Sequence, residues 1–191
     1  MKGVICIGAN LGQEIEGWMS LGIKDFMLFE PVAATFRRLE RIISNKEANF
    51  KLYNMALGNV TGEIEMFIET CHQGKSCSIL QPLLHLEQYP DIEFEAKETV
   101  RIDKLDNIDY DRRLYDQLHV DTQGYELEVL RGAERSLKAI DTITCEVYRK
   151  ELYKGCPMIE EVSEFMINRG FRIEGIFWKG LSWGDCTFTR R

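Results

Sequence analysis

The fold of this chain is decided by the stretch Val4-Ile5-Cys6-Ile7-Gly8-Ala9-Asn10-Leu11-Gly12-Gln13. Four apolar residues stop at a glycine-rich turn, and a helical pattern follows. This order is typical of the first strand and helix of a nucleotide-binding sheet. The turn presents backbone N–H groups to a ligand at the start of the helix. We therefore predict a cofactor site at this turn.

The next acidic residue narrows the choice of cofactor. An apolar strand over residues 25–30 ends at Glu30. Because neighbouring parallel strands end at the same sheet edge, this carboxylate can accept hydrogen bonds from ribose hydroxyls. Asn10 and Gln13 stand where a dinucleotide fingerprint requires glycines, which disfavours NAD and FAD, and the turn lacks the lysine and hydroxyl residue of a P-loop. S-adenosylmethionine remains the common ligand of this geometry.

Composition excludes several classes of protein. A chain of 191 residues suits a single domain with a core that needs no disulfide or metal. The formal charge of −7 works against binding to a phosphate backbone, so we expect no nucleic-acid partner. There is no signal-peptide pattern and no apolar run long enough to span a bilayer. Six cysteines without a C-x-x-C pair suit reduced thiols, and we expect a cytoplasmic protein.

The apolar pattern alternates between short strands and longer helical stretches, which predicts parallel βαβ units. The expected strands cover residues 3–8, 25–30, 50–55, 63–68, 97–102, 116–121, 142–148, 171–177 and 185–190. The expected helices cover residues 12–21, 32–46, 124–139 and 157–169. We predict that strands 63–68 and 97–102 pair as a ribbon. Residues 70–96 lack periodicity and are predicted to form a lid over the substrate side. Residues 171–190 are predicted to form a hairpin with an antiparallel returning strand.

Polar side chains at the predicted strand ends are the candidates for chemistry. His119 and Asp121 are two residues apart, so they leave their strand on the same face. Asp121 is equally typical of a helix N-cap. Glu146 lies in an apolar strand, where a charge must be paired, lie at the sheet edge or have a function.

The chain resembles the FkbM-type S-adenosylmethionine-dependent methyltransferases from residue 4 to about residue 177. The similar blocks, in order, are Ile7-Gly8-Ala9-Asn10-Leu11-Gly12-Gln13, Phe29-Glu30-Pro31, Asn54-Met55-Ala56-Leu57-Gly58, Val120-Asp121-Thr122-Gln123-Gly124-Tyr125-Glu126-Leu127-Glu128-Val129-Leu130-Arg131-Gly132-Ala133 and Glu146-Val147. The resemblance implies an α/β fold of the class I methyltransferase, Rossmann-like type. Such a fold has a mostly parallel seven-stranded sheet with a terminal antiparallel strand, and here an added β-ribbon.

The resemblance also implies roles for individual residues. The expected cofactor-binding residues are Gly8, Asn10, Gly12 and Gln13 at the amino-acid end, Glu30 at the ribose hydroxyls, and Ala56 at the adenine through its backbone. Ala9, Pro31 and Asp121 are also expected to bind the cofactor. We expect methyl transfer to a hydroxyl of a sugar or another small metabolite. Asp121 is the first choice for the general base or acceptor-orienting group, followed by His119 and Glu146. The family usually has an aspartate in place of Cys6 and a lysine in place of His119.

Several alternatives stay open at this point. Asp121 and Glu146 could instead bind Mg²⁺, but two carboxylates are few for a dedicated site, and we expect no metal. N-methylation of an amine or peptide, or a catalytically silent cofactor-binding module, are the other functions considered. The aromatic residues Phe177, Trp178 and Trp183 could form a sugar-stacking wall, a homodimer contact or ordinary packing.

Overall fold

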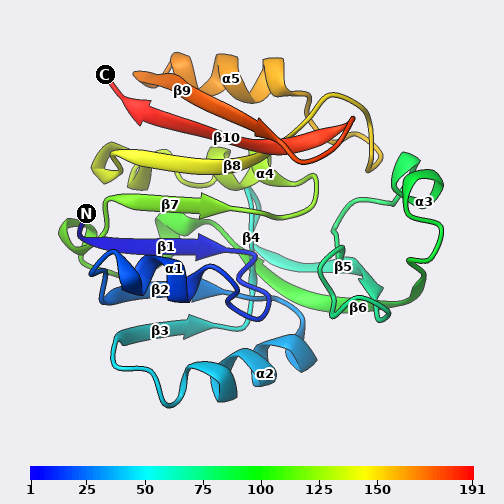
Figure 1. The fold of residues 1–191 in the computed structure, drawn as a ribbon, viewed down its shortest axis with the longest axis horizontal. Coiled ribbons are helices and arrows are strands. Elements are labelled where there is room, and N and C mark those ends of the chain that lie inside the picture. Colours follow the sequence, from blue (N-terminus) through cyan, green and yellow to red (C-terminus); the bar gives the residue numbers. More distant parts are fainter.

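The computed structural model describes residues 1–191 and contains the predicted mixed sheet. Its strands follow the order β3-β2-β1-β7-β8-β10-β9 (Figure 1). Their bounds are β1 Gly3–Ile7, β2 Asp25–Phe29, β3 Asn49–Tyr53, β7 Gln117–Val120, β8 Thr142–Tyr148, β9 Phe171–Trp178 and β10 Trp183–Arg190. β10 runs antiparallel to both β8 and β9, and every other pair is parallel. The antiparallel strand is confirmed, and it lies inside the sheet next to the edge strand β9.

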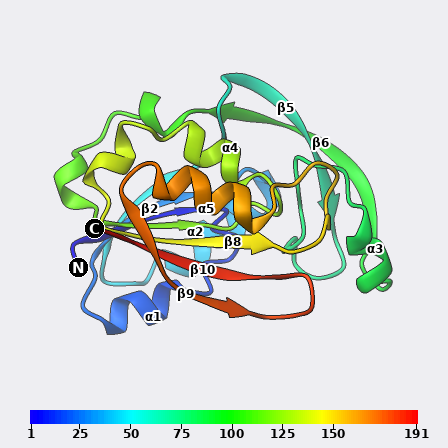
Figure 2. The same ribbon diagram turned by 90° about the horizontal axis from the view of Figure 1, so that it is seen from above.

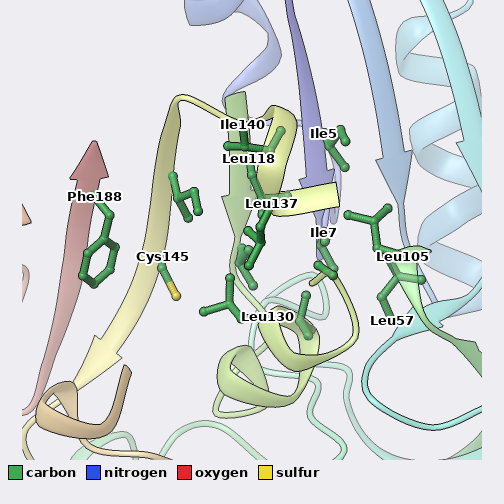
Figure 3. Close-up of a cluster of buried hydrophobic side chains, with 14 of the residues drawn as sticks. Ile5, Ile7, Leu57, Leu105, Leu118, Leu130, Leu137, Ile140, Cys145 and Phe188 are labelled. Atoms are coloured by element: carbon green, nitrogen blue, oxygen red, sulfur yellow. The ribbon is translucent and has the colours of Figure 1, made fainter. Parts of the chain in front are cut away.

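Helices cover both faces of the sheet, so the central strand β1 is buried on both sides. Val4 and Cys6 pack in a cluster with residues of α1 and α2, whereas Ile5 and Ile7 belong to the larger core beneath α4 and α5 (Figure 3). Figure 2 shows α4 and α5 on one side of the sheet and α1 on the other. Burial on both faces explains why β1 is continuously apolar. The helices are α1 Ile15–Ser20, α2 Ala33–Ile43, α3 Leu84–Gln88, α4 Glu126–Arg131 and α5 Ile159–Ile167, with 3₁₀ turns η1 Leu105–Asn107, η2 Arg112–Leu114 and η3 Ser136–Ala139.

The helix predicted over residues 124–139 is interrupted. α4 ends at Arg131, and only the short turn η3 continues the helical pattern. At Gly132 a Cβ atom would lie 1.9 Å from the backbone oxygen of Gly58, so the chain passes too close to another loop for a side chain. This long-range contact explains why a helical period in the sequence did not become one helix.

The other predicted helices are present but shorter. The first begins at Ile15 rather than at residue 12, because Gly12 has a φ of +73° and closes a turn. None of the helices is both long and apolar enough to cross a bilayer.

A second, smaller sheet stands beyond the carboxyl ends of the main strands (Figure 1). β5 (Gly62–Glu69) and β6 (Phe94–Asp103) are antiparallel, which confirms the predicted ribbon, and the short strand β4 (Ala56–Leu57) joins β6 in parallel. The segment 70–96, called the lid below, connects β5 to β6 and includes α3. Residues from the lid line the cavity described next, and its predicted role as a cover over the substrate stays a prediction.

Candidate active site

A cavity of about 440 Å³ lies at the carboxyl ends of the main strands, between the sheet, the lid and the β9–β10 hairpin. Its size is within the range of small-molecule sites. The predicted residues that line it are Gly8, Asn10, Gln13, Glu30, Pro31, Ala56, His119, Asp121 and Glu146. Ala9 and Gly12 do not line it: Ala9 is buried in the core, and a Cβ at Gly12 would meet the side chain of Ile15 at 2.5 Å. The sheet edge therefore brings most of the predicted site together.

The glycine turn after β1 is shaped by its neighbours on both sides. The backbone N–H of Gly8 donates to the carbonyl of Phe29 at 3.0 Å, which ties the turn to the end of β2. Gly8 has a φ of +82°, and a Cβ there would lie 1.8 Å from the backbone oxygen of Asp121. Only glycine permits this approach of the β1 and β7 ends, which sets the floor of the cavity.

Glu30 closes the end of β2 and is 5% exposed. Its two carboxylate oxygens accept hydrogen bonds from the backbone N–H groups of Asn10 (3.0 Å) and Val32 (2.8 Å). Burial raises its pKa to about 7, while these two hydrogen bonds oppose the shift. Each oxygen keeps a lone pair, so the carboxylate can still accept hydrogen bonds from ribose hydroxyls in the cavity.

The end of β3 supplies the apolar part of the cavity. The Asn54 side chain donates to the carbonyls of Glu30 (2.9 Å) and Pro31 (2.8 Å) and so joins the ends of β2 and β3. The buried residues Met55, Ala56 and Leu57 follow and line the cavity. Such a surface suits the face of an adenine ring.

Three acidic side chains gather at the ends of β7 and β8. Asp121, Glu126 and Glu146 each place one carboxylate oxygen within 4.8 Å of the other two. Burial raises the pKa of all three, to about 7 for Glu126, and the negative charge of Asp121 also raises the pKa of Glu126 and of Glu146. Buried carboxyls without a cation tend to hold protons, so this group favours the exchange of a proton near neutral pH.

Glu126 was not singled out by the sequence analysis. One of its oxygens accepts hydrogen bonds from the backbone N–H groups of Thr122 (2.8 Å) and Gly124 (3.1 Å), and the other is buried without a partner. Its place four residues after Thr122, in the conspicuous 121–126 block, is the signal that could have identified it. Oxygen ligands of this kind suit Mg²⁺, so Asp121, Glu126 and Glu146 are the residues that could hold such a cation.

A glutamine and two tyrosines connect these acidic groups. The Gln123 amide nitrogen donates to Asp121 at 2.6 Å and to Glu146 at 3.0 Å. The hydroxyl of Tyr148 donates to Glu146, and that of Tyr153 donates to the Gln123 amide oxygen at 2.7 Å. Sequence reasoning gave these partners no role. Tyr148 is the last residue of β8, Tyr153 follows that strand, and the approach of Tyr153 to Gln123 depends on tertiary packing.

The two positions where the chain departs from its family have different surroundings. Cys6 is buried beneath α1 and does not line the cavity. His119 lines the cavity, as does Asp121, and its ring lies 5.4 Å from that of Trp18 in an edge-on contact. Only the departure at His119 therefore changes the chemistry of the cavity wall.

The lid and the hairpin contact each other at the cavity, and the lid also reaches the glycine turn, where Asn10 donates to the Gln73 carbonyl at 3.0 Å. The Trp183 indole N–H donates to the hydroxyl of Tyr89 at 2.7 Å, and Ser182 donates to Gln88 at 2.5 Å. Lys179 lines the cavity and pairs with Asp185 of β10 at 2.7 Å. These contacts place polar and aromatic groups where an acceptor would enter.

The three hairpin aromatics have different environments. Trp183 lines the cavity, where a sugar ring could stack on it. Trp178 packs against the core and carries the Arg149 guanidinium 3.5 Å from its ring centre. Phe177 is 71% exposed. The three aromatic residues therefore do not form a single sugar-stacking wall.

Comparison with known proteins identifies the family. The chain is 27% identical over 161 residues to the 2-O-methyltransferase NoeI of Sinorhizobium fredii; the match covers 80% of this chain and 65% of that protein. The fold is similar to that of magnesium protoporphyrin IX methyltransferase from Synechocystis, whose structure was solved with bound SAM. The TM-score is 0.56 at 8% sequence identity, and the match covers 98% of this chain and 69% of that one. It is equally similar to 1,6-didemethyltoxoflavin-N1-methyltransferase of Burkholderia thailandensis, with a TM-score of 0.56, 9% identity and coverage of 99% and 71%.

These structural similarities establish the fold as that of a class I methyltransferase. The family profile of the methyltransferase FkbM domain matches residues 7–173. This range begins at the last residue of β1 and includes Asp121, Glu126 and Glu146. The chain therefore belongs to the FkbM methyltransferase family.

Proposed function

We propose that this protein is an S-adenosylmethionine-dependent methyltransferase that methylates a hydroxyl of a sugar or a similar small metabolite. The observation that carries the proposal is the cavity, which joins Glu30 at one end to Asp121 and Glu146 at the other. Membership in the family supports the cofactor, and the 2-O-methyltransferase relative supports oxygen as the accepting atom.

The cofactor end of the cavity is formed by β1, β2 and the segment after β3. Glu30 would accept hydrogen bonds from the two ribose hydroxyls, and Met55, Ala56 and Leu57 would pack against the adenine. Asn10 and Gln13 would face the amino-acid end, where their amides are already joined by a hydrogen bond of 2.8 Å. Each predicted contact uses a side chain that lines the cavity.

The acceptor end is formed by β7, β8, the lid and the hairpin. When bound, S-adenosylmethionine supplies a methyl group on a positively charged sulfur. The protein then has to hold the acceptor oxygen in line with that methyl group and to remove its proton. Asp121 would take this proton as the carbon–oxygen bond forms, with Glu146 beside it. His119 is the third titratable group on this part of the wall.

Titration calorimetry with S-adenosylhomocysteine tests the cofactor end. We expect Glu30→Ala to weaken binding at least about 10-fold, because it removes a buried acceptor of two ribose hydrogen bonds. Glu30→Gln, which keeps the shape, should have a smaller effect. Glu63→Ala, at an exposed position on β5, is the matched control. An affinity unchanged by Glu30→Ala would contradict the assignment.

A transfer assay with methyl-labelled S-adenosylmethionine tests the acceptor. The protein is incubated with a panel of free and nucleotide-linked sugars and, separately, with amines and peptides. Methyl ethers formed from the sugars are the expected result. Products found only among the amines would favour N-methylation. Cofactor binding with no product from either panel would favour a silent binding module.

A further inference from the structure

The lid reaches the cofactor end of the cavity through a turn at Gln73 and Gly74. Both residues have a left-handed backbone, with φ of +68° and +73°. The Asn10 side chain donates to the Gln73 carbonyl at 3.0 Å. A Cβ at Gly74 would lie 3.3 Å from the hydroxyl oxygen of Thr35 in α2 and 3.8 Å from the amide nitrogen of Asn10. This turn of the lid therefore packs against both the glycine turn after β1 and the first turn of α2.

Lys75 follows this turn directly and brings a positive charge to the cavity. It lines the cavity and forms no salt bridge with any carboxylate of the protein. The other lysine of the cavity wall, Lys179 in the β9–β10 hairpin, is already paired with Asp185 at 2.7 Å. No arginine lines the cavity. Lys75 is thus the lysine of this wall that is free to pair with a ligand.

The other ionisable groups of the wall do not favour a negatively charged ligand group. Four acidic residues line the cavity, namely Glu14, Glu30, Asp121 and Glu146. An anionic group that leaves water for such a wall requires a cation beside it, because an unpaired charge is costly to bury. Lys75 can supply that cation.

The cofactor itself carries one such group. In S-adenosylmethionine the adenine and ribose are neutral, and the sulfur and the amino group are positive. The only negative charge is the carboxylate of the amino-acid part. This part is expected beside Asn10 and Gln13, and Asn10 is the residue that holds the lid turn just before Lys75. The backbone of Lys75 therefore stands at the end of the cavity where the carboxylate is expected.

We propose that Lys75 binds the carboxylate of the cofactor through its ammonium group. This inference rests on the proposed function, and it makes Lys75 a binding residue with no part in proton transfer. Because Lys75 belongs to the lid, the ion pair would join the lid to the bound cofactor. It would add to the hydrogen bond between Asn10 and Gln73, which is present without any ligand.

The test is titration calorimetry with two ligands that differ only in the carboxylate. These are S-adenosylmethionine and decarboxylated S-adenosylmethionine, each titrated into the wild type and into Lys75→Met. We expect Lys75→Met to weaken the binding of S-adenosylmethionine about 10-fold or more, because a charged hydrogen bond is lost. The affinity for the decarboxylated ligand should stay within about twofold, since the group that Lys75 contacts is missing from it.

Two further variants serve as controls. Lys75→Arg keeps the positive charge and should retain most of the affinity for S-adenosylmethionine. Lys138→Met removes an exposed lysine of η3 that does not line the cavity, so it should bind both ligands like the wild type. This second variant measures the effect of losing one positive charge anywhere on the protein.

Equal losses for the two ligands in Lys75→Met would overturn the proposal, because the lysine would then act on a part that they share. Unchanged affinity for both would also overturn it. A raised KM for an anionic acceptor in that second case would assign Lys75 to the acceptor instead. Failure of the wild type to bind either ligand would contradict the proposed function itself.

Discussion

At the scale of single residues, the site depends on differences between chemically similar side chains. Glu30 and Glu146 are both buried carboxyls at strand ends, yet Glu30 accepts two backbone N–H groups, whereas Glu146 accepts from Gln123 and Tyr148. Glu30 is thus held by the backbone as a fixed acceptor for a ligand. Glu146 is part of a side-chain network with a second acid, which suits proton transfer.

Asp121→Asn separates catalysis from cofactor binding. The variant keeps the oxygen that accepts from Gln123 but cannot take a proton from the acceptor. We expect kcat to fall about 10²–10⁴-fold, the usual contribution of a general base. The affinity for S-adenosylhomocysteine, measured by calorimetry, should stay within about threefold. Full activity in Asp121→Asn would show that no base is needed at this position.

The sequence predicted the site residues at the strand ends better than it predicted the residues that contact them. Glu30 and Asp121 follow apolar runs, and parallel strands must end at one edge, so their approach could be predicted. Glu126 was overlooked although it lies in the 121–126 block itself, whereas Tyr153 reaches the same cluster through packing between the lid and the segment after β8. No local pattern encodes such a contact, because it joins segments far apart in the chain.

At the scale of elements, the lid is fastened both to the hairpin and to the ends of the main strands. Ser78 donates to the Gln123 carbonyl at 2.6 Å, and the Asn10 side chain donates to the Gln73 carbonyl at 3.0 Å. α3 and the residue after it contact β10 and the preceding turn through the pairs Tyr89 with Trp183 and Gln88 with Ser182. Both pairs lie on the side where an acceptor would enter. Breaking these two pairs would loosen the part of the lid around α3 and leave the hydrogen bond between Asn10 and Gln73 in place.

Tyr89→Phe should loosen the lid. The substitution leaves the Trp183 indole N–H without its acceptor, at a cost of about 1–3 kcal/mol if no other group replaces it. Hydrogen–deuterium exchange in residues 70–96 should rise several-fold, with β1 and β7 unchanged. Tyr53→Phe, where the ring stacks on Phe29 in the core, is the control. Equal exchange in the two variants would show that this contact does not hold the lid.

The helices and strands could be predicted where their side chains are buried in a regular pattern, on one face or on both. β1 and β2 were predicted within one residue of their ends because, apart from Asp25 at the start of β2, they contain no polar residue. The prediction of a single helix over residues 124–139 was wrong. The local sequence pattern is helical, but it is interrupted at Gly132, where the backbone lies close to the Gly58 carbonyl. Residues 70–96 lack periodicity in the sequence, and the structure contains α3 and the start of β6 there, which were not predicted. The role of this segment as a lid stays a prediction.

At the scale of the whole molecule, the buried acids make stability depend on pH. Burial raises the pKa of Glu30 and Glu126 to about 7, from an ordinary value of 4.5. Between these values the folded protein holds protons that the unfolded chain has lost. The contribution of these groups to the free energy of unfolding is therefore fully present below pH 4.5. It decreases as the pH rises from 4.5 toward 7.

We expect the unliganded protein to have a lower Tm at pH 8 than at pH 5.5. One such group accounts for about 1–3 kcal/mol over this range, which corresponds to roughly 3–10 °C. Glu126→Gln cannot titrate and keeps an oxygen for Thr122 and Gly124, so its Tm should change less with pH. Calorimetric scans at the two pH values measure this difference. Parallel pH dependence in the wild type and Glu126→Gln would contradict the assigned titration.

The central claim is that one cavity holds the cofactor with its reactive sulfur facing the carboxyl pair. A crystal structure of the S-adenosylhomocysteine complex tests it most directly. We predict ribose hydroxyls within hydrogen-bond distance of Glu30, adenine beside Ala56, and the sulfur directed toward Asp121 and Glu146. A bound molecule whose sulfur points away from these carboxyls, or whose ribose lies elsewhere, would contradict the account.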